Sequence, residues 1–402
     1  MTPAPARRPL LVDTTLREGE QFAAAHFSSE DKRRLALALD AFGVEYLEHT
    51  SPVASPGSER DLRMLTGLGL RARVVTHVRC QEDDVRRALG CGVDGVNLLF
   101  GTSALLRAAS HGRGIDELLA EAQAAIRLAR GAGVEVRFSC EDAFRTETAD
   151  LLRIYTAVDA WGVDRVGVAD TVGVATPQEV ERLVSTVRAA VRCDIEFHGH
   201  NDGGCAVANA AAAFGAGATH LNVTVLGLGE RNGIAPLSGL VARLYLTDPA
   251  LVARYDLAAL PALDRMVADM VGVPVPFNAC ITGETAFTHK AGLHTNAVLR
   301  EPRSYEALDP AVFGRERQVL AGSRLTGRHA VAHRAARLGV PLSPEQVRRL
   351  TAEVKAAADA GALTDDELDA RICAFARSLP DAPPSLPTAE RTFHDSPPSN
   401  PR

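Results

Sequence analysis

The chain has 402 residues, of which 46% are hydrophobic and 23% are charged, an ordinary composition for a globular protein. Its formal net charge of -6 argues against a nucleic-acid or anionic-membrane surface, so an anionic ligand would need a local basic site. The 7 cysteines include no C-x-x-C pair, and no segment reaches the roughly 20 apolar residues of a membrane span. We therefore expect a soluble, cytoplasmic protein with reduced thiols.

From about residue 9 to 275, one unit recurs: a short apolar run, an amphipathic stretch and a glycine-bearing turn. The apolar runs predict strands at residues 10–15, 44–50, 72–78, 95–100, 134–140, 164–170, 194–200 and 219–227. Their uniformly apolar character is typical of parallel strands covered by helices. Eight such units in about 250 residues favour an α/β fold closed as a TIM (β/α)8 barrel over a doubly wound open sheet.

Helices are expected between these strands, because apolar residues recur there at three- and four-residue spacing. Two examples are residues 29–42 and 177–191. Ser29 is expected to be the N-cap of the first, and Thr176, before a proline, the N-cap of the second.

The character of the sequence changes after about residue 275. We expect the catalytic barrel to span residues 1–275, followed by a linker and small subdomain at 276–330 and a helical subdomain at 331–378. Residues 343–378 predict two amphipathic helices. The proline- and serine-rich tail, 379–402, is expected to be disordered.

Most polar residues of the predicted strands lie at the carboxyl ends, which meet on the catalytic face of a barrel. His198 and His200 are two residues apart on one strand, so both imidazoles face the same side and can bind one divalent ion. The loop after the first strand, residues 13–21, offers Glu18 as a third ligand and Arg17 for a substrate oxyanion. The alternatives are a solvated charged loop and polar residues that merely mark strand ends.

Ten motifs, in order along residues 9–375, resemble homocitrate synthases and, more broadly, the acyl-CoA-condensing barrels that include isopropylmalate and citramalate synthases. LREGEQF and TSPVAS favour the homocitrate branch, and isopropylmalate synthases typically have aspartate at the position of Glu18. The motifs are DTTLREGEQ (13–21), TSPVAS (50–55), THVRC (76–80), GTS (101–103), RFSCEDAFR (137–145), VGVADTVG (166–173), EFHGHND (196–202), LGLGERNG (226–233), ITGETAFTHKAGLH (281–294) and SRLTGRHA (323–330).

The resemblance implies a divalent cation (zinc, magnesium or manganese) held by Glu18, His198 and His200. Mixed nitrogen and oxygen ligands do not choose among these metals. The 2-oxo acid would bind this ion, and Arg137 would pair with its distal acid group. The substrate-binding residues implied by the resemblance are Gln21, His77, Arg137, Ser139 and Thr171.

The resemblance also implies the catalytic residues. Arg17 would help to polarise the ketone, and His294 with Glu141 would remove a proton from the methyl group of acetyl-CoA. Tyr305 would donate a proton or orient the base. In relatives the segment that carries His294 reaches over the barrel of a partner subunit, which implies a homodimer. His289 is expected to be an ordinary structural histidine.

Three positions depart from the family pattern, one of them Gly203, which occupies the place of the usual threonine. Asn97 replaces an aspartate common in lysine-regulated homocitrate synthases, in which Glu48 and Glu196 also help to hold the inhibitor's ammonium, so weaker lysine feedback is expected. His49 follows Glu48 where relatives usually have an uncharged residue. It either points inward, as an extra cation near the acceptor, or packs against a helix.

The resemblance therefore implies condensation of acetyl-CoA with 2-oxoglutarate to give homocitrate, followed by hydrolysis of the thioester. One alternative is the same reaction with phosphonopyruvate, giving 2-phosphonomethylmalate, or with oxaloacetate. Another is a metal-dependent aldolase or lyase that uses no CoA, although the HKAGLH segment argues against it. The native metal and inhibition by lysine stay open.

Overall fold

The computed structural model describes residues 8–380, and the chain divides into two compact units. Among the described residues, the first runs to Ala286 and includes residues 312–314, and the second comprises residues 287–311 and 315–380. The tail that we expect to be disordered lies, from residue 381 on, outside the described residues.

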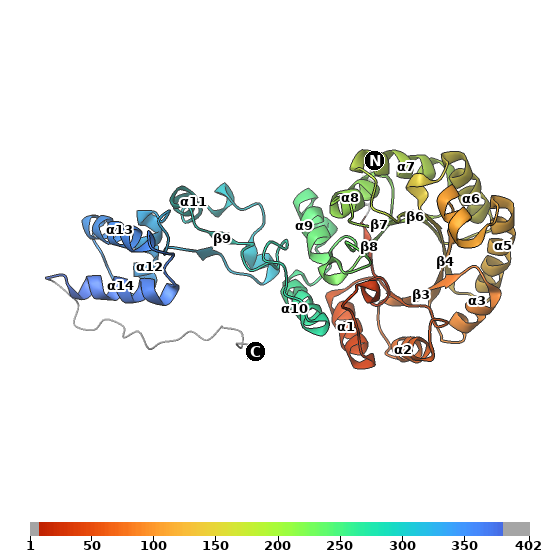
Figure 1. Ribbon diagram of the computed structural model, residues 1–402, viewed down its shortest axis with the longest axis horizontal. Helices are drawn as coiled ribbons and strands as arrows, with labels where there is room; N and C mark the ends of the chain where they lie inside the picture. The colour runs from red at the N-terminus through yellow and green to blue at the C-terminus, as the bar shows by residue number, and fades with distance from the viewer. Residues whose placement is uncertain (1–7, 381–402) are drawn as a thin grey trace, which may run out of the picture. The chain divides into compact units, whose positions relative to one another are not determined.

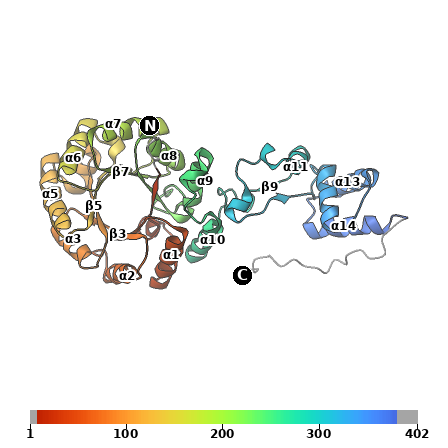
Figure 2. The ribbon, with the colours of Figure 1, turned by 180° about the vertical axis from the view of Figure 1, so that it is seen from behind.

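The first unit contains a closed barrel of parallel strands in sequential order, as Figures 1 and 2 show from opposite sides. Closure is made by β8 and β1, whose register pairs Leu10 with His220 and Asp13 with Val223. The predicted barrel is therefore confirmed. Its strands are β1 (Leu10–Asp13), β2 (Tyr46–His49), β3 (Arg73–Arg79), β4 (Gly95–Gly101), β5 (Glu135–Glu141), β6 (Arg165–Asp170), β7 (Asp194–Gly199) and β8 (His220–Val223).

Helices surround the barrel, and all of them except the short α4 bury apolar side chains against it (Figure 1). They are α1 (Ser29–Phe42), α2 (Pro56–Thr66), α3 (Glu82–Leu89), α4 (Ala104–Leu106), α5 (Ile115–Gly131), α6 (Thr148–Ala160), α7 (Pro177–Ala190), α8 (Ala206–Ala216), α9 (Leu237–Thr247) and α10 (Leu260–Val271).

The N-cap of α1 is Ser28, so the prediction of Ser29 was wrong by one residue. The Ser28 hydroxyl accepts a hydrogen bond of 3.1 Å from the backbone N–H of Asp31, whose carboxylate accepts one from the backbone N–H of Ser28. A capping box needs an acid three residues after the cap, and from Ser29 that position is Lys32. The prediction of Thr176 as the N-cap of α7 is confirmed.

The last predicted strand is shorter than its apolar run. Pairing with β1 ends at Val223, and the chain then turns through the 3-10 helix η4 (Val225–Gly227), in which Leu226 has a φ of 59°. The backbone N–H of Thr224 already bonds to the carbonyl of Ala235. The run from 224 onward thus packs as a buried turn.

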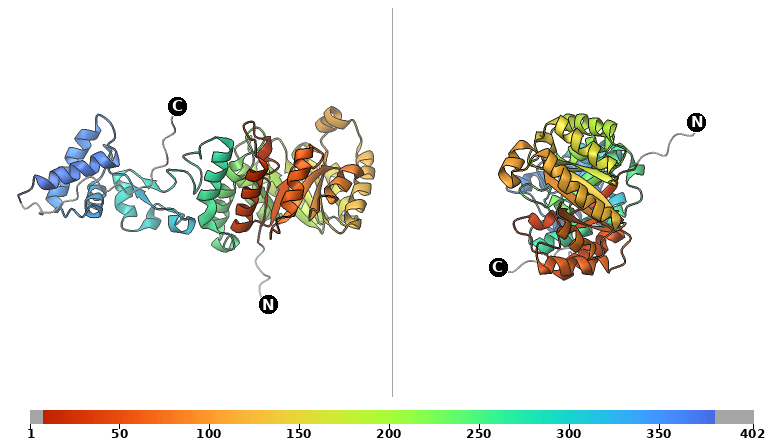
Figure 3. Two further views of the ribbon diagram at one scale, coloured as in Figure 1. Left: turned by 90° about the horizontal axis from the view of Figure 1, so that it is seen from below. Right: turned by 90° about the vertical axis from the view of Figure 1, so that its right-hand side faces the viewer.

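The second unit has its own apolar core, centred on Val331, Leu350, Val354 and Ile372. Two short parallel strands and several helical segments build it; Figure 3 shows its last helices in blue. Helices α13 and α14 confirm the pair predicted within 343–378. The elements are β9 (Thr288–His289), α11 (Gly292–Val298), η7 (Pro302–Ser304), β10 (Gln318–Val319), α12 (Arg328–Arg337), α13 (Pro344–Ala358) and α14 (Asp365–Arg377).

Across residues 8–380, no helix is both long enough and apolar enough to cross a lipid bilayer.

Candidate active site

Glu18, His198 and His200 converge at the carboxyl end of the barrel, and all three are buried. The two imidazole Nε2 atoms are 3.3 Å apart, and the carboxylate oxygens of Glu18 lie 3.9 Å from His198 Nε2 and 3.8 Å from His200 Nε2. Ligand atoms about 2.1 Å from one ion lie roughly 3 to 3.5 Å apart. Among the described residues, only these three form such a histidine and carboxylate group.

The tautomer of His198 leaves its inner nitrogen free to bind an ion. Its Nδ1 lies 2.9 Å from Oδ1 of Asn222 on β8, and because an amide oxygen only accepts, the proton is on Nδ1. Nε2 therefore presents a lone pair toward His200. A second residue that orients a ligand histidine in this way is usual at metal sites.

The ionisation of these ligands also suits a cation. Burial lowers the pKa of His198 to about 3 and lowers that of His200. Burial alone would raise the pKa of Glu18, but the positive charge of Arg17, together with His198 and His200, lowers it to about 2. At neutral pH two neutral imidazoles and a carboxylate face one another, as metal binding requires. The residues present therefore fit a divalent ion.

Arg17 lies beside this cluster. Its guanidinium contacts Glu18 at 2.6 Å and Glu48 at 2.8 Å, and the hydroxyl of Thr14 donates to Glu48 at 2.6 Å. Burial opposes the charge of Arg17, but the carboxylates of Glu48 and Glu18 outweigh it and raise the pKa of the guanidinium. Arg17 thus keeps a positive charge next to the candidate metal site.

Glu196 holds two arginines inside the barrel. Its Oε1 lies 2.9 Å from Nε of Arg137 and accepts from the amide of Asn222 at 3.0 Å, while its Oε2 accepts from Nε of Arg165 at 3.1 Å. Because Asn222 also contacts His198, the carboxylate connects the predicted substrate arginine to a predicted metal ligand. Glu196 is fully buried; Asn222 and Arg165 donate hydrogen bonds to it, and Arg137 forms an ion pair with it.

The strand register brings the predicted acceptor-binding residues side by side. His77 of β3 pairs with Asn97 of β4, and Asn97 pairs with Arg137 of β5. The amide of Asn97 donates to Glu48 at 2.5 Å, whereas its Oδ1 is buried without a hydrogen bond among the described residues. His77 Nδ1 is 3.7 Å from Glu48, which is too long for a hydrogen bond. These polar atoms are available to a ligand.

His49 packs against helices, so the inward-pointing alternative is wrong. It follows Glu48 on β2, and successive strand residues face opposite sides. Its Nδ1 contacts the carbonyl of Thr50 at 2.8 Å. Burial first, and then the charge of Lys32 on α1, lower the pKa of His49 to about 4. A neutral histidine behind the strand adds no cation to the acceptor pocket.

The other predicted barrel residues lie around the mouth. Gln21 is exposed at the end of the 3-10 helix η1 (Gly19–Gln21). The Thr171 hydroxyl accepts from the backbone N–H of Asp142 at 2.8 Å and so joins the loops after β6 and β5. Glu141 ends β5, and its charge acts on Arg17. Ser139 lies deeper, with its hydroxyl 3.4 Å from the carbonyl of Gly167.

His294 and Tyr305 belong to the second unit. Their ring centroids are 4.2 Å apart at an interplanar angle of 30°, and both side chains are exposed. The structure therefore brings the side chains of these two predicted residues into contact.

Sequence reasoning missed Asn222 and Arg165, which lie inside apolar runs. The available signal was period-two alternation: Asn222 shares its strand face with His220, as Arg165 does with Gly167. A polar residue on the inward face of a barrel strand could have been marked for that reason.

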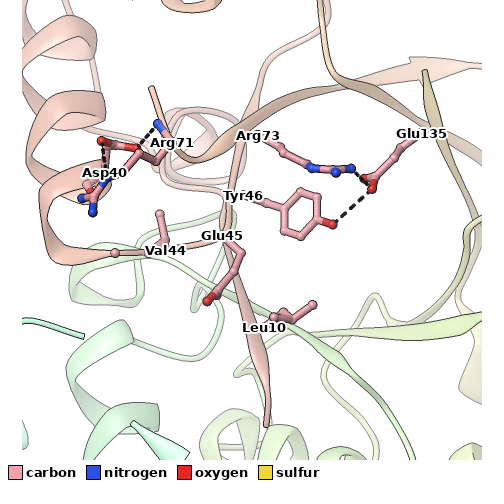
Figure 4. A pocket seen from close by; sticks show the side chains of 9 residues that line it. Leu10, Asp40, Val44, Glu45, Tyr46, Arg71, Arg73 and Glu135 are labelled. Carbon is pink, nitrogen blue, oxygen red and sulfur yellow. Dashed lines mark hydrogen bonds and ion pairs between the residues drawn. The ribbon is translucent and has the colours of Figure 1, made fainter. Parts of the chain in front are cut away.

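A hollow of about 380 Å³ lies at the opposite, amino end of the strands (Figure 4). The hydroxyl of Tyr46 bonds to Glu135 at 3.4 Å, and Arg73 forms an ion pair with the same carboxylate. The charged groups that line this hollow are paired with one another, and residues on the amino face of a barrel usually contribute to stability. We therefore place the candidate active site at the carboxyl end.

Comparison with known proteins shows the family to which the chain belongs. The family model described as HMGL-like matches residues 8–267, and one described as homocitrate synthase post-HMGL domain-like matches residues 281–362. The chain therefore belongs to the HMGL-like family. Hydroxymethylglutaryl-CoA lyase from Pseudomonas aeruginosa has the same barrel fold, with a TM-score of 0.58 at 22% identity over 67% of this chain and 95% of that one.

Within the family, the chain is similar along most of its length to homocitrate synthases, which confirms the resemblance seen in the motifs. It is 49% identical to the mitochondrial homocitrate synthase of Schizosaccharomyces pombe over 92% of this chain and 89% of that protein. It is 48% identical to the cytosolic isozyme of Saccharomyces cerevisiae over 91% of this chain and 86% of that protein. A probable 2-isopropylmalate synthase of Methanopyrus kandleri is 39% identical.

Proposed function

We propose that the protein condenses acetyl-CoA with 2-oxoglutarate and hydrolyses the thioester to give homocitrate. The similarity to homocitrate synthases over about nine tenths of the chain carries this proposal. The buried group of Glu18, His198 and His200 beside a permanently charged Arg17 supports it, because such a site suits a 2-oxo acid.

In the proposed mechanism, Glu18, His198 and His200 hold a divalent ion, which when bound supplies Lewis-acid polarisation of the ketone. Arg17 offers its positive charge to the oxygen on which negative charge develops. Arg137 pairs with the distal carboxylate of the acceptor, since its guanidinium suits a planar anion. Gln21, His77, Ser139 and Thr171 surround the acceptor.

We propose that His294 takes a proton from the acetyl methyl group, with Glu141 orienting the imidazole and Tyr305 donating a proton or orienting the base. The methyl carbon attacks the ketone carbon, the ketone oxygen gains a proton, and water then releases CoA. The second unit of one chain would act at the barrel of the other in a homodimer. We also propose a cytoplasmic location, although relatives include both mitochondrial and cytosolic enzymes.

Feedback by lysine is proposed to be weak. Asn97 stands where a further carboxylate would bind an ammonium, and Glu196 is already held by Arg137, Arg165 and Asn222.

The reaction is tested by following thiol release from acetyl-CoA with a panel of 2-oxo acids and divalent metals. Turnover is expected to be fastest with 2-oxoglutarate. Turnover with phosphonopyruvate or oxaloacetate but not with 2-oxoglutarate would overturn the homocitrate assignment. If no 2-oxo acid released thiol, the condensation itself would be rejected in favour of a lyase without CoA.

A further inference from the structure

Glu306, the residue after Tyr305, is held by two side chains in the second unit. Arg317 donates to both of its carboxylate oxygens, with Nε at 2.7 Å and Nη2 at 2.5 Å, and His289 Nε2 lies 2.9 Å from the same carboxylate. Paired contacts between a guanidinium and a carboxylate fix geometry as well as adding energy. We call Glu306, Arg317 and His289 the Glu306 clamp.

The clamp ties an irregular segment to a small sheet. His289 belongs to β9 and pairs in register with Val319 of β10, and Arg317 directly precedes β10. After η7 the chain forms turn-type hydrogen bonds, from Tyr305 N–H and Glu306 N–H to the carbonyl of Pro302, and then the 3-10 helix η8 (Pro310–Phe313). The clamp therefore adds side-chain contacts at Glu306, in the turn between η7 and η8 that follows Tyr305.

The side chain of Glu306 is 5% exposed. Burial alone would raise its pKa, but Arg317 and His289 lower it, so the carboxylate is ionised at neutral pH. An ionised, nearly buried carboxylate is costly unless its partners stay in place, which makes the arrangement sensitive to the loss of any one of them.

Tyr305 depends on this restraint. Its ring is 46% exposed and lies against the imidazole of His294, at 4.2 Å between centroids. The Cα atoms of Tyr305 and Glu306 are about 3.8 Å apart across one peptide bond. A restraint on Glu306 therefore also restrains the position of the Tyr305 backbone, from which the tyrosine side chain extends.

We propose that Glu306 is a positioning residue that, through its clamp with Arg317 and His289, holds Tyr305 against His294. This inference rests on the roles of His294 and Tyr305 under the proposed function. It also assigns a role to His289 of the HKAGLH motif, which has no proposed catalytic role: its imidazole helps to hold Glu306 in place.

The chain offers a matched control in the same turn. Glu301 forms an ion pair with Arg303 at 2.8 Å, but their side chains are 52% and 86% exposed. An exposed pair of this kind contributes little. Glu301→Gln removes the same charge as Glu306→Gln, four residues before Tyr305, without touching the clamp.

The test uses the full-length, metal-loaded enzyme with Glu306→Gln, Glu301→Gln and Arg317→Lys. For Glu306→Gln we expect kcat to fall on the order of tenfold to a hundredfold, the cost of a small misplacement of a reacting group. The KM for 2-oxoglutarate should stay near that of the wild type, because its proposed contacts lie in the barrel. Arg317→Lys keeps the positive charge but loses the paired guanidinium contact with Glu306, so its kcat should lie between those of Glu306→Gln and the wild type. The kcat of Glu301→Gln should match that of the wild type.

A double variant distinguishes a purely structural role of Glu306 from a role that acts through Tyr305. If Glu306 acts through Tyr305, Glu306→Gln should lower kcat little further in a Tyr305→Ala background. Wild-type kcat in Glu306→Gln, equal losses in Glu306→Gln and Glu301→Gln, or additive losses with Tyr305→Ala would overturn the proposal. So would a loss explained fully by the fraction of unfolded protein, measured by thermal melting.

His294→Ala distinguishes this inference from the proposed function. An active His294→Ala enzyme would reject the base assignment and the clamp's purpose together. An inactive His294→Ala enzyme beside a fully active Glu306→Gln enzyme would reject the clamp alone.

Discussion

At the scale of single residues, Asn222 decides which nitrogen of His198 faces the candidate metal site. It accepts the Nδ1 proton of His198 through its carbonyl oxygen and donates its amide to Glu196. One side chain therefore sets the tautomer of a candidate ligand and is itself oriented by a buried carboxylate. Removing it should weaken metal binding without removing any ligand.

Asn222→Ala is expected to lower the affinity for the divalent ion by about 10- to 100-fold, the usual loss for a residue that orients a ligand histidine. Titration of the metal-free protein by calorimetry measures this directly. Asn209→Ala removes another buried asparagine, one that donates to the carbonyl of Ala175, and serves as the control. Unchanged affinity in Asn222→Ala would contradict the orienting role.

Asp13 should make stability depend on pH. Burial raises the pKa of its carboxyl from 3.8 to about 7 in the folded state. Between these values the folded chain keeps a proton that the unfolded chain has released, so stability falls as pH rises and levels off above about 7. Asp13→Asn is expected to remove this fall, as chemical denaturation of metal-free protein at pH 5 and 8 would show. An equal loss of stability in both proteins would contradict it.

The sequence predicted which residues gather at the candidate metal site better than it predicted the residues around them. His198 and His200 are visible because two histidines on one strand face must point the same way. The direction of His49 stayed open, since a histidine suits either face of a strand. Asn222 and Arg165 were hidden because their contacts with Glu196 cross from one strand to others, and such contacts appear only when the barrel closes.

At the scale of elements, the strands and helices follow from local patterns, while their ends depend on particular hydrogen bonds. Apolar runs and glycine turns predict all the barrel strands. The run at 219–227 is longer than β8 because its last residues are buried in a turn that an apolar pattern cannot distinguish from a strand. The cap of α1 was misplaced because adjacent serines compete and only the position of Asp31 separates them.

The cap of α7 gives an element-scale prediction. The Thr176 hydroxyl takes part in a reciprocal capping box with Glu179. Thr176→Ala is expected to destabilise the protein by about 1 kcal/mol. Thr186→Ala on the same helix is the control, because that hydroxyl only bonds back to the carbonyl of Arg182 and is not a cap. Equal changes in the denaturation midpoints of the two variants would contradict the capping account.

At the scale of the whole molecule, the predicted catalytic groups are divided between two compact units. Glu18, Arg17 and Glu141 belong to the first, and His294 and Tyr305 belong to the second. The motifs reveal both sets of residues, and only the resemblance implies that the second unit of one chain acts at the barrel of another. That assignment depends on assembly between chains, which no local pattern encodes.

Mixing two inactive variants tests the proposed sharing of active sites. In a mixed dimer of His198→Ala and His294→Ala chains, one site would combine an intact barrel with an intact second unit. Half of the dimers in an equal mixture are mixed, and one of two sites in each is intact, so activity should return to about a quarter of the wild type. No recovery after subunit exchange would contradict sharing, and a monomeric protein would contradict the homodimer.

The central claim is that Glu18, His198 and His200 bind one divalent ion that receives the 2-oxo acid. The most direct measurement is a spectroscopic titration of the metal-free protein with Mn²⁺, with and without 2-oxoglutarate. We predict one ion per chain, a change in its spectrum when 2-oxoglutarate is added, and loss of the site in a folded His200→Ala variant. Equal Mn²⁺ binding in that variant, or a bound ion that does not respond to the 2-oxo acid, would contradict the account.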